Sequence, residues 1–147
     1  MTGSKFVYVT FIRTSPEKLW SALTTPEFIQ QYWFDMTHET DWKIGSPWKM
    51  LFPDGRVADV GEIAEFDPPK RLAFKWRNEW RPDLKVEGWS RCVMELEPAD
   101  DAVKLTVSHT IEVENSKFIE AVSGGWPKIL SNLKSLLETG EVAIASK

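Results

Sequence analysis

The sequence predicts an α+β fold in which a curved antiparallel sheet of about seven strands surrounds a long C-terminal helix, with two short helices after the first strand. Three observations predict it. Turn-type clusters divide residues 35–113 into six runs of strand length, spaced as in antiparallel hairpins. A β-rich run at 6–13 precedes them, and apolar residues at helical spacing fill residues 118–137. We expect one domain over residues 1–147, with residues 1–4 and 141–147 loosely held.

The first strand and the two short helices follow from local signals. Residues 6–13 are rich in β-branched and aromatic side chains, which favour strands. The run Ser15-Pro16-Glu17 then begins a helix with a capping serine, a proline at the first helical position and an acid in the first turn. The run Thr25-Pro26-Glu27 repeats this signal, so a second short helix follows.

The last two strands alternate clearly enough to assign their faces. The inward set of residues 103–113 contains one histidine among apolar residues: Val103, Leu105, Val107, His109, Ile111 and Val113. The inward set of the preceding strand is Ser90, Cys92, Met94 and Leu96. If Glu97 pairs with Lys104 as opposite charges, Cys92 lies opposite His109. A register shifted by one inward residue puts Ser90 or Met94 there instead.

The covered face of the sheet needs a partner, and the C-terminal segment supplies it. Its helically spaced apolar residues run from Phe118 to Leu137, and Gly140 stands where a C-terminal glycine cap belongs. Because Pro127 restricts the residue before it, we expect Gly124-Gly125 and Pro127 to bend or interrupt the start of this helix.

Tryptophan is the unusual component, at 8 of 147 residues. Apolar helix faces carry Trp20, Trp33 and Trp126, whereas strand alternation places Trp76 on the inner face and Trp89 on the outer face. The tryptophans therefore predict a cavity with at least two indole walls, Trp76 and Trp126.

Two further residues, Trp80 and His38, lie outside the two clearly alternating strands. Trp80 lies in a loop of aromatic and arginine residues that acidic neighbours neutralise, so we expect a structural hairpin with Arg–Trp stacking there. A rim for ligand entry and a dimer contact are the alternatives for this loop. His38 shares the alternating face of Met36 and Trp42, so an inward position is open to it.

Composition excludes several functional classes. The net charge of −4 without a basic run argues against nucleic-acid partners and against an anionic membrane surface. The N-terminus lacks the apolar core of a signal peptide and no run reaches transmembrane length, so we expect a cytoplasmic protein. Cys92 is the single cysteine, which excludes an internal disulfide, and with two histidines it predicts neither a metal site nor a cofactor.

Three stretches resemble a known superfamily. They are Ser15-Pro16-Glu17-Lys18-Leu19-Trp20-Ser21-Ala22-Leu23-Thr24 with Pro26-Glu27, then Gly61-Glu62-Ile63 through Asp67-Pro68-Pro69-Lys70-Arg71-Leu72, and Gly125-Trp126-Pro127-Lys128-Ile129-Leu130 through Leu133-Lys134. The chain resembles the START-like, or helix-grip (SRPBCC), superfamily. More narrowly, it is similar to the family of the C-terminal domain of the activator of heat shock protein 90 ATPase. The resemblance implies that helix and sheet enclose a cavity, which in this superfamily holds apolar or aromatic small molecules and in some members hosts cyclisation or hydrolysis.

The first functional hypothesis is a binding protein that holds a small apolar or aromatic molecule in this cavity, without a cofactor. We expect a monomer or homodimer. The predicted ligand-binding residues are Phe74, Trp76, Met94, Val107, His109, Trp126, Ile129 and Leu130.

Two alternatives remain open. One is a cyclase- or hydrolase-type enzyme that uses His109 with Glu62 or Cys92 in the cavity. For Glu62 the face depends on register: pairing Phe66 with Leu72 turns it inward, whereas pairing Asp67 with Leu72 turns Ile63 inward. The other alternative, implied by the resemblance alone, is a chaperone-interaction module.

Overall fold

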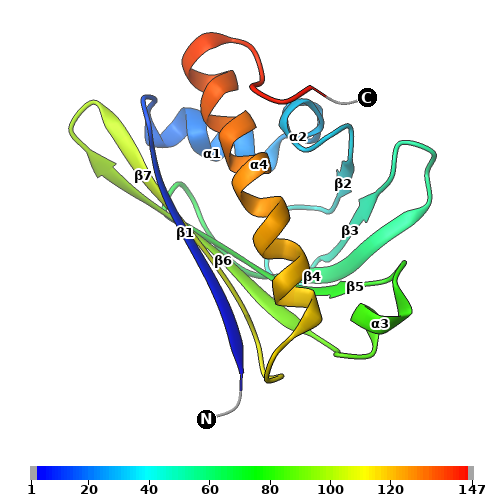
Figure 1. The fold of residues 1–147 in the computed structure, drawn as a ribbon. Coiled ribbons are helices and arrows are strands. Elements are labelled where there is room, and N and C mark those ends of the chain that lie inside the picture. Colours follow the sequence, from blue (N-terminus) through cyan, green and yellow to red (C-terminus); the bar gives the residue numbers. More distant parts are fainter. Residues whose placement is uncertain (1–2, 146–147) are drawn as a thin grey trace.

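One seven-stranded antiparallel sheet, in the order β1-β7-β6-β5-β4-β3-β2, forms the body of the molecule (Figure 1). The computed structural model describes residues 3–145. The strands are β1 (Ser4–Ile12), β2 (Thr37–Glu39), β3 (Pro47–Leu51), β4 (Val57–Asp67), β5 (Arg71–Asn78), β6 (Ser90–Ala99) and β7 (Ala102–Ile111). Six of them come from residues 35–113, which confirms the prediction made from the turn clusters.

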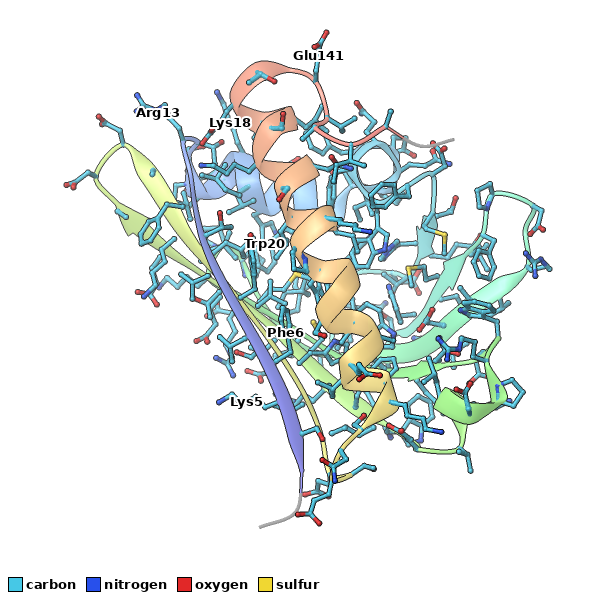
Figure 2. All side chains as sticks on the ribbon, viewed as in Figure 1. Lys5, Phe6, Arg13, Lys18, Trp20 and Glu141 are labelled. Atoms are coloured by element: carbon cyan, nitrogen blue, oxygen red, sulfur yellow. The ribbon has the colours of Figure 1, made fainter. Side chains whose placement is uncertain are left out.

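The helices cover one face of this sheet. They are α1 (Pro16–Thr24), α2 (Pro26–Tyr32), α3 (Pro82–Lys85) and α4 (Lys117–Thr139). Figure 1 shows α4 lying across the sheet, with α1 and α2 near its C-terminal end and α3 near its N-terminal end. Side chains fill the layer between α4 and the strands (Figure 2). No helix within residues 3–145 has the length and apolarity needed to cross a bilayer.

Helix α4 runs unbroken for 23 residues, so of the bend or interruption expected at Gly124-Gly125 the interruption is wrong. Ser116 caps its start by accepting a hydrogen bond from the Ile119 amide (3.0 Å), and Gly140 ends it at a φ of 87°. Pro127 removes only one helical N–H donor, while Trp126 and Leu130 beside it are buried against the sheet. This packing holds the helix through its weak segment.

Both ends of the described chain are bonded to the body. Ser4 begins β1 and donates from its hydroxyl to the Val113 carbonyl (2.6 Å). The Asn132 side chain bonds the backbone N–H and carbonyl of Ile144, at 2.6 and 2.9 Å. The ends that we expected to be loosely held include residues 1–2 and 146–147, which lie outside the described residues.

The register of the last hairpin confirms the predicted pairing. Glu97 lies opposite Lys104 and Cys92 lies opposite His109. All inward residues of β7 from Val103 to His109 are fully buried, so the alternation identified the covered face correctly.

Each of the two registers predicted for β4 and β5 is correct over only part of β4, because β4 contains a bulge. Phe66 pairs with Leu72, yet Ile63 pairs with Phe74 and is buried. An extra residue between Ile63 and Glu65 reverses the side-chain alternation. Glu62 therefore faces outward opposite Lys75, which corrects its possible inward position.

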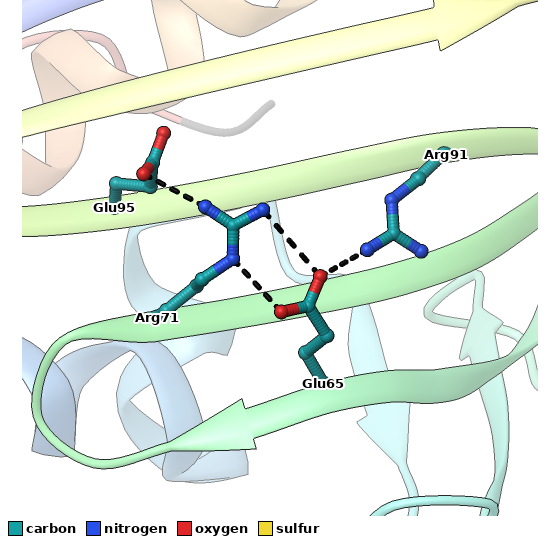
Figure 3. A network of polar contacts seen from close by, with 4 residues as sticks. All are labelled: Glu65, Arg71, Arg91 and Glu95. Carbon is teal, nitrogen blue, oxygen red and sulfur yellow. Dashed lines mark hydrogen bonds and ion pairs between the residues drawn. The ribbon is translucent and has the colours of Figure 1, made fainter.

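The outer face carries an ion network over β4, β5 and β6 (Figure 3). Arg71 bonds Glu65 (2.9 Å) and Glu95 (2.7 Å), and Arg91 bonds Glu65 as well. The hydrogen bond from Arg71 holds the pKa of Glu65 below its usual value. Since these side chains are more than a third exposed, the network marks the solvent face and adds only modest stability.

Gly61 and Gly124 should respond oppositely to alanine. A Cβ at Gly61 would lie 1.6 Å from the Lys75 carbonyl oxygen, whereas a Cβ at Gly124 meets nothing within 4 Å. We expect Gly61→Ala to lower the unfolding free energy by about 1–3 kcal/mol or more, and Gly124→Ala to raise it by about 0.5–1 kcal/mol. Urea denaturation of both variants checks this. A Gly61→Ala protein as stable as the wild type would contradict the close approach of β4 and β5.

Candidate ligand-binding site

Trp76 on β5 is the centre of an aromatic cluster on the inner face. Its ring centroid lies 4.6 Å from that of Trp48, 5.0 Å from His109, 5.9 Å from Trp126 and 6.0 Å from Trp33. All of these side chains are buried. Tilted and edge-to-face aromatic contacts of this kind add to the stabilisation that burial gives. The cluster joins α2, the sheet and α4.

His109 forms a buried chain of hydrogen bonds between α4 and the sheet. The Trp126 indole N–H donates to His109 Nδ1 (3.1 Å). An indole nitrogen can only donate, so Nδ1 is the acceptor and Nε2 carries the proton. Nε2–H then donates to Ser90 Oγ (3.0 Å), and the Ser90 hydroxyl donates to the Trp76 carbonyl oxygen (2.9 Å). Every polar atom of the imidazole is thus satisfied.

The structure brings Cys92 opposite His109 but shows no hydrogen bond from either of the other candidate catalytic residues to the imidazole. Burial lowers the pKa of His109 to about 3, so the ring is neutral near pH 7. Cys92 lies opposite it but makes no hydrogen bond to it, and burial raises the pKa of the thiol. A thiol of raised pKa is a poor nucleophile. Glu62 lies on the opposite face of the sheet.

His38 on β2 forms a second tryptophan–histidine pair. The Trp48 indole N–H donates to His38 Nδ1 (3.1 Å), which again assigns the proton to Nε2. His38 is 3% exposed and its Nε2 has no hydrogen-bond partner among the described residues. The ring of Trp33 lies edge-on to it at 4.5 Å. Burial lowers the pKa of His38 to about 3 as well.

A pocket of about 180 Å³ adjoins this cluster, between the inner sheet face and the helices α3 and α4. Its walls are mainly aromatic and aliphatic: Trp33, Met50, Asp59, Trp76, Asn78, Trp80, Arg81, Leu84, Phe118, Ala121, Val122, Trp126 and Ile129. Trp80 is the half-exposed residue at its rim and packs edge-on against Phe52, with centroids 5.5 Å apart.

The predicted ligand-binding residues divide between this pocket and the closed core. Three of them line the pocket: Trp76, Trp126 and Ile129. The others are buried in the core and do not line it: Phe74, Met94, Val107, His109 and Leu130.

Asp59 on β4 is a pocket residue that sequence reasoning missed. It is 5% exposed, and its Oδ2 accepts a hydrogen bond from the Trp76 indole N–H (2.7 Å). Burial raises its pKa to about 6, opposed in part by that hydrogen bond. The available signal was parity, because Asp59 shares the face of Gly61 and Ile63 once Ile63 is placed inward.

A larger groove of about 580 Å³ lies elsewhere, with both inner- and outer-face residues on its walls. Charged side chains such as Lys75, Arg91 and Glu112 line it beside Trp89. Lys75 and Arg77 lie over the Trp89 ring, at 4.8 and 4.4 Å from its centroid. The arginine stacking expected at Trp80 is therefore found at Trp89. Within residues 3–145 no group of three or more His, Cys, Asp or Glu side chains could hold a metal ion.

Comparison with known proteins identifies the family. The family model described as Activator of Hsp90 ATPase homolog 1-like protein matches residues 13–138. The chain belongs to this family. No curated protein matches the sequence.

Several solved structures have the same fold. Protein MLL2253 from Mesorhizobium loti superposes with a TM-score of 0.81 at 23% identity, covering 95% of this chain and 100% of that one. The Aha1 dimer from Colwellia psychrerythraea gives 0.74 at 21%, covering 93% and 98%. CalU16 from Micromonospora echinospora gives 0.75 at 20%, covering 92% and 77%. At these identities the likeness shows the fold alone.

Replacing His109 tests whether its role is structural. We expect His109→Leu to lower the unfolding free energy by about 2–4 kcal/mol, because it leaves the buried Trp126 N–H and Ser90 oxygen without partners. Urea denaturation measures the loss. Thr110→Val, the next residue along β7 with its side chain on the outer face, is the control and should change stability by less than about 0.5 kcal/mol. Equal stability of His109→Leu and wild type would contradict the proposed chain.

Stability should fall as pH is lowered from 6.5 towards 4. Each buried histidine has a pKa of about 3 when folded, against 6.5 unfolded, so in this window the unfolded chain binds the extra protons. This costs up to about 1.4 kcal/mol per pH unit per histidine. Asp59 opposes the loss below pH 6, because its raised pKa makes the folded chain hold a proton that the unfolded chain releases. His38→Gln should flatten the profile in urea denaturation; a flat wild-type profile would contradict these assignments.

Proposed function

We propose that this chain is a binding protein that holds a small aromatic molecule in the pocket between α4 and the inner sheet face. The observation that carries the proposal is the wall itself, in which four indole rings and Phe118 line about 180 Å³ of space. Ligand pockets are concave and mostly apolar, with a few convergent polar groups. An apolar cavity of about 150 Å³ is large enough to bind benzene, so a single-ring molecule fits this volume.

Binding is favoured over the His109-based enzyme hypothesis by the surroundings of the imidazole. Both of its nitrogens are engaged in hydrogen bonds to Trp126 and Ser90, and neither Cys92 nor Glu62 bonds to it. A general base needs a free nitrogen within reach of substrate.

A second candidate function is activation of a chaperone ATPase, and family membership is the observation that favours it. Addition of the purified chain to a heat shock protein 90 ATPase assay tests this candidate. An unchanged hydrolysis rate at saturating chain concentration would remove it.

Filling the pocket should abolish ligand binding. Val122 lines the pocket from α4 and is partly buried, whereas Lys128 on the same helix is exposed and lies outside it. We expect Val122→Phe to weaken binding of benzyl alcohol at least tenfold and Lys128→Phe to leave it unchanged. Titration followed by the fluorescence of the pocket tryptophans measures both, since phenylalanine adds no competing signal.

Two outcomes would contradict the proposal. The first is no saturable change across a broad panel of aromatic and lipid probes. The second is equal binding by Val122→Phe and Lys128→Phe. If Trp89→Ala then abolished the signal, the binding would belong to the groove beside Trp89 instead.

A further inference from the structure

Asp59 is a buried carboxylate without a cationic partner. Its Oδ2 accepts from the Trp76 indole, but no hydrogen bond or ion pair from the described residues reaches its Oδ1. The side chain lines the pocket, so a bound molecule can reach that oxygen. Buried carboxylates in proteins are normally paired, since an isolated charge is costly to remove from water.

The charged groups near Asp59 are bonded to one another and not to Asp59. Glu79, at the end of β5, is bonded to Arg77 (2.6 Å) and Lys85 (3.1 Å). Arg81 reaches the pocket rim, but its guanidinium is bonded to Asp83 (2.9 Å). The lining residues from α4 are all uncharged, as are Trp33 and Met50 from the other side. Asp59 is thus the unpaired charge of the pocket.

The aromatic walls favour the same kind of ligand as the carboxylate does. Indole and phenyl faces attract cations, most strongly where water is excluded. Trp33, Trp76 and Trp126 are each at least nine-tenths buried and line the pocket together with Phe118 and Trp80. A cation bonded to Asp59 would lie among these aromatic side chains.

We propose that the pocket recognises a protonated amine on an aromatic or other apolar body, with the ammonium group donating a hydrogen bond to Asp59 Oδ1 and packing against the indole faces. This inference rests on the proposed function and names the ligand class of that site. Asp59 is the specificity-determining residue, and the apolar walls hold the remainder of the molecule.

Benzylamine and benzyl alcohol form a matched pair of probes, because they have the same size and differ in charge at pH 7.5. We expect the wild-type chain to bind benzylamine at least tenfold more tightly than benzyl alcohol. Asp59→Asn keeps an acceptor for the Trp76 N–H and should bring the two affinities to within about threefold. Glu120→Gln, which removes an exposed carboxylate from α4, should leave the preference unchanged.

The pH dependence of the wild-type chain provides a test that needs no variant. Because burial raises the pKa of Asp59 to about 6, benzylamine affinity should fall by about tenfold per pH unit below that value. Benzyl alcohol affinity should stay constant. The buried histidines, with pKa values of about 3, do not titrate between pH 7.5 and 5, and the pKa values of Glu79 and Asp83 are lowered by their partners.

The outcomes separate this inference from the proposed function. Equal affinities for the two probes, or tighter binding of the alcohol, would overturn the ammonium specificity and leave the aromatic pocket standing. An amine preference that persists in Asp59→Asn and across the pH range would overturn the role of Asp59. Binding of neither probe by the wild-type chain would overturn both.

Discussion

The hydrogen-bond chain from Trp126 through His109 and Ser90 to the Trp76 carbonyl is the constraint on which the site depends. Each member is buried, and buried polar groups must find partners within the protein. The chain therefore fixes α4 against β5, β6 and β7 in one position. It also fixes two of the indoles that line the pocket, those of Trp76 and Trp126. A purely apolar contact surface between helix and sheet would tolerate sliding, whereas this set of donors and acceptors has one satisfied arrangement.

Much of this framework could be predicted from the sequence, because it depends on local and periodic signals. The alternation of β7 and one charge pair were enough to place Cys92 opposite His109. The same parity placed Trp76 on the inner face and Trp89 on the outer face, where the structure has them.

The inward position of Asp59 follows from only one of the two registers that the sequence allows for β4. Neither Asp59 nor the pocket mouth could therefore be predicted from alternation alone. The bulge after Ile63 reverses the alternation of β4, and no local residue pattern marks an inserted residue in a strand. Reading β4 as a regular strand from its Phe66–Leu72 pairing turns Glu62 inward and Asp59 outward. The pocket residues also come from separate parts of the chain, with Trp33 after α2, Asp59 on β4 and Val122 on α4. Only the folded topology brings them together.

Most of the residues that give the pocket its charge and aromatic character differ from those that carry the family resemblance. The stretches that carry the family resemblance contain helix caps, turns and the segment of α4 around Trp126. Asp59, Trp33, Trp76 and Trp80 lie outside all of them. The motifs thus place α4 and its Trp126 over the sheet, while the pocket's carboxylate and its other indoles lie outside the motifs. Family members can therefore share this fold and bind unlike ligands, because a fold does not determine the chemistry of its site. For the ligand class proposed here, the unpaired carboxylate of Asp59, rather than the shared fold, is the group that would select the ligand.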